Sequence, residues 1–272
     1  MNLKARARVV IDTRGLIANL TLRELRTKYR RSFLGWTWSL LNPLATVALY
    51  SFVFGRLFGS VAPTGNPSGI TQFSLYLLCG VIPWNFFSTV TNMSTGAILG
   101  NSGLVRKVAF PRQALVVSQV LFMMVQSSIE LGLVSVILLF AGSPLLPWLP
   151  FVALLLVLLA VFAAGLSMAV SVLTVYFRDL PYLWTIVIQV WFFLTPIVYN
   201  YDSVSERLGN RARFVIQLNP MTGFIRSFRN CLFDGRHPDF VVVGALALVA
   251  MTTLLLGTAI FVRFNRRLAE EA

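Results

Sequence analysis

Long apolar runs alternate with short polar or Pro- and Gly-rich links along the whole chain. Six of these runs approach the roughly 20 residues that a helix needs to cross a hydrocarbon core of about 30 Å. The pattern therefore predicts an all-α integral membrane protein with six transmembrane helices. They cover approximately residues 36–58, 73–99, 114–140, 151–176, 182–199 and 240–262. This transmembrane domain, residues 36–263, is expected to lie between a cytoplasmic N-terminus, residues 1–35, and a cytoplasmic tail, residues 264–272.

An amphipathic helix is predicted immediately before the first apolar run. Thr21 and Glu24 have the spacing of a capping box, which predicts that this helix begins at Leu22. Leu25 and Tyr29 continue its apolar face. The remaining positions carry a set of cations: Arg23, Arg26, Lys28, Arg30 and Arg31. Such a helix is expected to lie in the plane of the membrane surface with its cations at headgroup level. The alternative is an anchor that only fixes orientation through the positive-inside rule.

Residues 201–238 contain two apolar pieces, Phe214–Leu218 and Met221–Phe233, separated by Asn219-Pro220. Neither piece is long enough to cross a membrane. They predict external re-entrant helices before the last span, because irregular backbone at depth must be surrounded by protein or water.

Glu130 is the acidic residue placed well inside a predicted span. A carboxylate in that position is costly, so it should face the protein interior or water and find a partner. Arg226 and Arg229 of the re-entrant region are the candidate partners.

Charge distinguishes a membrane partner from a nucleic acid. The chain has 23 Lys and Arg against 10 Asp and Glu, but 57% of its residues are hydrophobic and the cations mostly flank apolar runs. Anionic lipid headgroups are therefore the simpler partner, and nucleic acid is not expected. The cations also concentrate in alternate links, which predicts a multi-pass protein of the plasma membrane with both termini in the cytoplasm.

Candidate enzymatic chemistry is sparse. The sequence contains no Gly-Lys pair and hence no phosphate-binding loop of the P-loop ATPases. His237 is the single histidine, and Cys79 and Cys231 are isolated, so no metal site is predicted. Transport without catalysis by this chain is the better prediction.

The link Asn101–Gln113 places an apolar triplet between cations. It predicts a short amphipathic helix on the cytoplasmic face that docks on a soluble partner. The alternative is an ordinary positive-inside loop.

Five short motifs, in order, are similar to those of one family. They are Arg-Thr-Lys-Tyr-Arg-Arg-Ser-x-Leu-Gly-x-x-Trp at residues 26–38, Arg-Lys-x-x-Phe-Pro-Arg at 106–112, Phe-Arg-Asp at 177–179, Thr-Pro-Ile-x-Tyr at 195–199, and Asn-Pro at 219–220 followed by Phe-x-x-Ser-x-Arg at 224–229. Together they resemble the permease subunit of type-2 ABC exporters of cell-surface polysaccharides, the Wzm/TagG group. The resemblance covers nearly the whole chain.

That resemblance implies a homodimer with the transport path between protomers. It also implies a separate ABC ATPase subunit, which holds ATP and magnesium, so no cofactor is expected on this chain. The cargo would be a lipid-linked polysaccharide of the O-antigen, teichoic acid or galactan type. The coupling role would fall on Leu104, Val105, Arg106, Lys107, Phe110 and Arg112.

A mechanism follows as a hypothesis. The cations of residues 23–31 would bind the diphosphate of a polyprenyl carrier. Aromatic rings would give the glycan a surface on which to slide, although each ring could instead belong to a lipid-facing belt. The candidates are Tyr50, Phe54, Trp191, Phe192 and Tyr199. Two rival functions remain open, namely a type-2 ABC permease for a drug or small lipid, and a membrane-embedded transferase.

Overall fold

The computed structural model describes residues 3–29, 38–57, 62–103, 110–199, 214 and 216–265. Helices dominate these residues. In chain order they are α1 (Leu3–Tyr29), α2 (Trp38–Tyr50), the π-helix η2 (Ser51–Leu57), α3 (Phe73–Thr95), the 3-10 turn η3 (Leu99–Asn101), α5 (Gln113–Phe140), the 3-10 turn η4 (Leu146–Trp148), α6 (Leu149–Tyr176), α7 (Leu180–Leu194), α9 (Pro220–Arg229), the π-helix η5 (Asn230–Asp234) and α10 (Phe240–Asn265).

Within the described residues, four helical segments are long and apolar enough to cross a membrane: Phe73–Thr95, Gln113–Phe140, Leu146–Tyr176 and Phe240–Phe264. They match the second, third, fourth and sixth predicted spans, so the prediction of an all-α membrane protein is confirmed. The first and fifth predicted spans contain shorter apolar helices.

The residues at the two ends of α7 explain why this apolar helix is short. It begins directly after Asp179 and has Pro181 in its first turn, where a missing backbone N–H costs nothing. It ends at Leu194 because Thr195 is extended and the next residue, Pro196, cannot donate a helical hydrogen bond. The helix thus stops before the predicted end of this span at residue 199.

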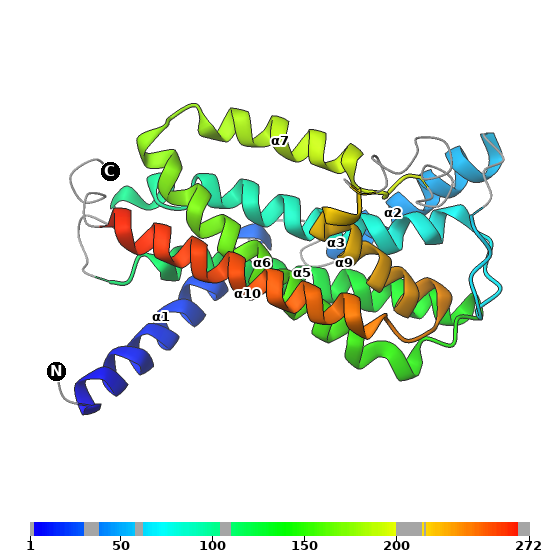
Figure 1. Ribbon diagram of the computed structural model, residues 1–272, viewed down its shortest axis with the longest axis horizontal. Coiled ribbons are helices and arrows are strands. Elements are labelled where there is room, and N and C mark those ends of the chain that lie inside the picture. Colours follow the sequence, from blue (N-terminus) through cyan, green and yellow to red (C-terminus); the bar gives the residue numbers. More distant parts are fainter. Residues whose placement is uncertain are drawn as a thin grey trace.

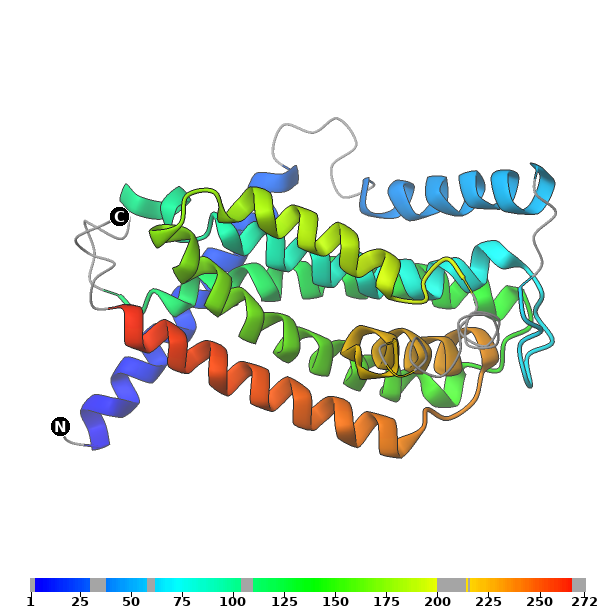
Figure 2. The same ribbon diagram turned by 45° about the horizontal axis from the view of Figure 1, so that its top comes forward.

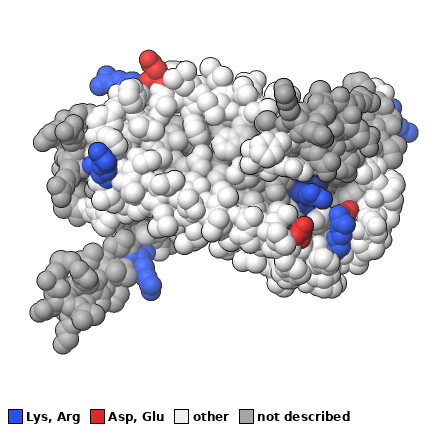
Figure 3. Space-filling model, in the orientation of Figure 1, with Lys and Arg blue, Asp and Glu red and all other residues white. Residues whose placement is uncertain are grey.

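The helices form an elongated bundle with both chain termini at one end and the turn between α9 and α10 near the other (Figure 1). α2 and α7 lie along one side of the bundle, and α10 lies along the opposite side (Figure 2). On the face shown in Figure 3, the described charged side chains lie towards the two ends and leave an uncharged band between them. Such a band is the surface that a hydrocarbon core requires.

Small residues allow α6 and α10 to pack with their backbones in contact. A Cβ atom at Gly165 would lie 2.5 Å from the carbonyl carbon and oxygen of Thr253, and one at Gly257 would overlap the carbonyl group of Gly165. α6 therefore packs on α10 at Gly165, because only glycine permits this approach.

Replacing Gly257 by alanine is expected to lower the free energy of unfolding by about 1–3 kcal/mol, the usual cost of overpacking. Thermal unfolding of the purified protein in detergent measures the change. Gly244→Ala on the same helix is the control, because a Cβ there meets nothing within 4 Å. Equal melting temperatures for the two variants would contradict the close contact.

The N-terminal helix differs from its prediction. α1 is continuous from Leu3 to Tyr29, so the predicted start at Leu22 is wrong. The hydroxyl of Thr21 does not cap a helix but donates to the carbonyl oxygens of Ile17, at 2.9 Å, and Ser118 of α5, at 3.4 Å. Apolar burial continues the helix upstream, since Leu20 packs with Ala114 and its neighbours.

The C-terminal part of α1 packs alongside α5. Thr21 contacts Ser118, and Lys28 reaches Gln126. This part of α1 therefore runs in the same direction as α5. Gln126 lies thirteen positions after Gln113, the first residue of α5, which is about 20 Å along the helix axis. The placement of this stretch at headgroup level stays a prediction.

Candidate functional site

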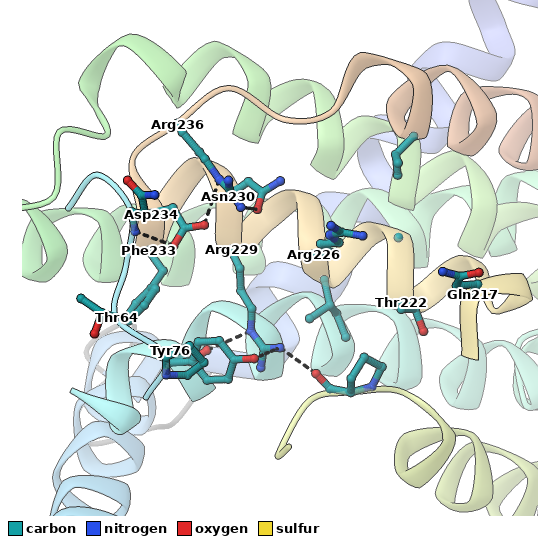
Figure 4. A pocket seen from close by; sticks show the side chains of 16 residues that line it. Thr64, Tyr76, Gln217, Thr222, Arg226, Arg229, Asn230, Phe233, Asp234 and Arg236 are labelled. Carbon is teal, nitrogen blue, oxygen red and sulfur yellow. Dashed lines mark hydrogen bonds and ion pairs between the residues drawn. The ribbon is translucent and has the colours of Figure 1, made fainter. Parts of the chain in front are cut away.

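A buried arginine joins three parts of the chain. Arg229 of α9 is 7% exposed and donates to the hydroxyl of Tyr76, at 2.9 Å, and to the carbonyl oxygen of Pro196, at 2.7 Å (Figure 4). It also donates to the carbonyl oxygens of Tyr76 and Ile197. Its guanidinium carbon lies 3.7 Å from the centroid of the Tyr76 ring. Four hydrogen bonds and a cation–π contact thus stabilise a buried charge and hold α3, α9 and the segment after α7 together.

A second polar residue fastens the same elements. The side-chain oxygen of Asn219 accepts from the backbone N–H of Met221, which caps α9, and from the indole N–H of Trp191 at 2.8 Å. Its amide nitrogen donates to the hydroxyl of Thr195 at 2.8 Å. Two motifs that lie far apart in the sequence, residues 195–199 and 219–229, are therefore bonded directly to each other.

The predicted pairing of Glu130 with Arg226 or Arg229 is wrong. Glu130 instead accepts a hydrogen bond from Gln126 at 3.0 Å, one turn away on α5. Gln126 in turn accepts from Lys28 of α1 at 3.4 Å. The pairing failed because Arg229 is saturated by α3 and the segment after α7, whereas the long α1 supplies a cation beside Glu130.

These side chains line a polar cavity of about 440 Å³ between α1, α3 and α5. Its polar lining residues are Glu24, Thr27, Lys28, Asn85, Thr89, Gln126, Ser127 and Glu130. Ionisable groups beside membrane-spanning helices must be solvated or paired, and this cavity leaves space for water next to them.

The cavity opens along a polar stripe on α3 that sequence reasoning missed. Asn85, Ser88, Thr89 and Asn92 share one helix face, and none of the four is buried, whereas most other residues of α3 are. Their i, i+3, i+4, i+7 spacing was a readable signal in the sequence. In a helix that is otherwise mostly buried, these amides and hydroxyls form a partly exposed polar face, of which Asn85 and Thr89 line the cavity.

The predicted cationic set is divided by the structure. Arg23 and Arg26 are exposed on α1, and Lys28 faces α5, where its ammonium lies 5.4 Å from the centroid of the Phe122 ring. Arg30 and Arg31 lie outside the described residues. The role of the five cations in binding a headgroup or diphosphate stays a prediction.

The predicted coupling segment is described only at its borders. Leu104, Val105, Arg106 and Lys107 lie outside the described residues. Phe110 packs with Leu20, Ala114 and Leu115, and Arg112 immediately precedes α5. On the other border Asn101 accepts a hydrogen bond from Arg23 at 3.1 Å. Both borders of the segment are thus attached to α1.

The predicted aromatic candidates pack mainly within the chain. The ring centroids of Trp191 and Phe87 are 5.1 Å apart, and those of Phe192 and Trp84 are 5.6 Å apart. Tyr50 is half-buried, and the side chain of Phe54 lies outside the described residues. The hydroxyl of Tyr199 donates to the carbonyl oxygen of Phe193 at 3.1 Å.

Sequence reasoning passed over the aromatic side chains that α7 exposes most. Phe193 is 66% exposed and Tyr182 is 77% exposed. Among the aromatic residues of α7, these two present the most open ring surface.

A bundle that contains four helices long and apolar enough to cross a membrane is the architecture of an integral membrane protein. The sequence model of one family, the ABC-2 type transporter, matches residues 16–233, and the chain belongs to this family.

Its relatives cover almost the full chain. The O-antigen export system permease protein RfbA of Myxococcus xanthus is 30% identical over 264 residues, which are 97% of each chain. The protein of the same name in Klebsiella pneumoniae is 26% identical and covers 94% of each chain. The polysialic acid transport protein KpsM of Escherichia coli is 25% identical over 89% of this chain and 90% of its own.

Proposed function

We propose that this chain is the transmembrane subunit of an ATP-driven exporter that moves a lipid-linked cell-surface polysaccharide across the plasma membrane. The family and the names of three full-length relatives support an export role with a polysaccharide cargo. ATP hydrolysis belongs to a separate ABC ATPase subunit, and this chain supplies the path.

The observation that carries the proposal is the polar stripe of α3 beside the cavity lined by Gln126 and Glu130. A glycan carries many hydroxyl groups, and each must keep a hydrogen-bond partner while it crosses a region without bulk water. Neutral amides and hydroxyls on α3 offer such partners without a strong fixed charge, so the glycan can exchange them as it moves.

The finer organisation belongs to the same proposal. Two copies of the chain pair with the path between them, both termini lie in the cytoplasm, and α2–η2 and α7 are the first and fifth of six spans. The broad exposed apolar surface of α7 supports this pairing, since Ile188 is its one fully buried residue and most of its other side chains require a covering of lipid or protein. The exposed rings of Tyr182 and Phe193 would then add to the aromatic surface that the sequence predicted for the glycan.

The deciding experiment is complementation of a cell that lacks this chain. Surface polysaccharide, detected by immunoblot of whole cells, should return only when the chain is expressed with its ATPase partner. If the reconstituted chain moved or modified its cargo without a companion ATPase, the proposed function would fail. Transport of a drug or small lipid, with no effect on surface glycan, would favour the rival permease.

Replacement of Asn85 by leucine is expected to reduce polysaccharide export about threefold to tenfold, because one hydrogen-bonding group of the path is worth about 0.5–1.5 kcal/mol. The immunoblot of surface glycan at equal protein expression measures the loss. Thr252→Leu on α10 is the matched control, since Thr252 is also an exposed polar residue of a membrane helix but lies outside the cavity lining. Unchanged export in Asn85→Leu would show that α3 does not line the path.

A further inference from the structure

The end of the bundle opposite the termini holds a second cavity, of about 450 Å³, whose function the transport path does not explain (Figure 4). Arg229 and Tyr76 lie on one side of it. Its other walls come from the link before α3, with Thr64 and Asn66, and from α9 and the residues that follow η5. We call this cavity the outer arginine pocket, after its lining residues Arg226, Arg229 and Arg236.

Arg236 is held in place at the mouth of the pocket. Its Nε lies 3.0 Å from a carboxylate oxygen of Asp234, and its Nη2 donates to the side chain of Asn230 at 3.0 Å. Asp234 is itself fixed, because its carboxylate accepts from the backbone N–H of Asn66. Burial raises the pKa of the Asp234 carboxyl, and the neighbouring Arg236 opposes that rise. Arg236 is therefore preorganised by its neighbours.

Arg226 differs from both other arginines. Its side chain is exposed and forms no hydrogen bond or ion pair within the part of the chain that the structure describes. It lies on α9 one turn before Arg229 and lines the same pocket. The pocket thus combines three guanidinium groups with the single carboxylate of Asp234, which gives it a formal charge of +2 when all four groups are ionised.

Such a pocket has the chemistry of a phosphate site. The planar guanidinium fork matches the oxygens of phosphate groups, and charge-assisted hydrogen bonds of this type are among the strongest in proteins. The neutral polar side chains of Thr64, Asn66 and Gln217 offer additional hydrogen-bonding groups. A single carboxylate already engaged by Arg236 leaves Arg226 available to an incoming anion.

We propose that the outer arginine pocket binds the phosphate groups of a lipid in the outer leaflet, with Arg226 and Arg236 as its direct ligands. The placement at the outer face depends on the orientation given under the proposed function. Two sources share this chemistry, the diphosphate of the exported carrier lipid and the headgroup of an anionic phospholipid. In either case the pocket would retain a phosphorylated lipid beside α9, which is held against α3 and the segment after α7 by Arg229.

The test uses the complex of this chain with its ATPase partner in nanodiscs of phosphatidylcholine. Native mass spectrometry counts bound undecaprenyl diphosphate or phosphatidylglycerol as each lipid is titrated. We expect the unaltered complex to bind at least one of the two, and Arg226→Gln to weaken that binding about tenfold or more, since a hydrogen bond to a charged group is lost. Arg226→Lys should restore part of the affinity.

Arg263→Gln is the matched control, because Arg263 is an exposed arginine at the opposite end of the bundle, at the end of α10. Tight binding of undecaprenyl diphosphate alone supports the carrier as ligand, and equal binding of phosphatidylglycerol supports a general headgroup site. Binding of neither lipid by the unaltered complex, or equal binding by Arg226→Gln, would overturn the proposal. If lipid binding failed in this way but glycan export were normal, the proposed function would still stand. If complementation failed but the lipid bound, the proposed function would be rejected and the lipid-binding proposal would stand.

Discussion

Replacement of Arg229 by methionine is expected to lower the free energy of unfolding by about 3–6 kcal/mol and to abolish export. Methionine leaves three buried acceptors without their donor, namely the carbonyl oxygens of Pro196 and Ile197 and the Tyr76 hydroxyl. Each unsatisfied buried group costs about 1–3 kcal/mol. The contact of the guanidinium with the Tyr76 ring is lost as well. Thermal unfolding in detergent, together with surface glycan in complemented cells, measures both effects.

Two variants separate the role of Arg229 from that of positive charge alone. Arg229→Lys keeps the charge but offers a single ammonium in place of the guanidinium fork, so it should recover only part of the stability. Arg226→Met changes an exposed arginine on the same helix and should leave the melting temperature nearly unchanged. If Arg229→Met and Arg226→Met had the same melting temperature, the hydrogen bonds of Arg229 would not contribute to stability.

Reversal of charge at Arg106 and Lys107 is expected to abolish export while the protein still inserts and folds. The two residues lie outside the described part of the chain, and the expectation comes from their place in the motif at residues 106–112. The borders of the segment support a mechanical role, because Asn101 is bonded to Arg23 and Phe110 packs against α1. Force applied here by an ATPase subunit would reach α1 and the polar cavity beside Lys28.

The measurement compares Arg106→Glu/Lys107→Glu with Arg263→Glu, which alters an exposed arginine in the last turn of α10. Membrane level and melting temperature should be equal in both proteins. Surface glycan should disappear only in the double variant, and its ATPase partner should no longer copurify. Wild-type export in the double variant would refute the coupling assignment.

The residues of the two motifs illustrate why the sequence predicted individual residues of the site but not the contacts between them. Thr195 and Pro196 belong to one motif, and Asn219 and Arg229 belong to another, but nothing in the spacing of the two motifs indicated that they bond to each other. Such contacts depend on how α9 enters the bundle beside α3, which is a long-range packing outcome. Glu130 shows the same limit, since the sequence indicated that it faces the protein interior or water but did not indicate Gln126 as its partner.

Hydrophobic periodicity and length alone determined that this is an all-α membrane protein, and they located the four long apolar helices to within a few residues, because a bilayer imposes one length and one backbone solution on every span. Local chemistry also accounts for Pro181 in the first turn of α7 and for the cap of α9 at Asn219. Only the tertiary structure decided that α1 continues through the expected cap at Thr21. Burial of Leu20 against α5 stabilises an uninterrupted helix there, and a local capping signal is worth too little to oppose it. The tertiary structure also decided which polar side chains contact one another, because those contacts depend on the packing of helices that lie far apart in the sequence.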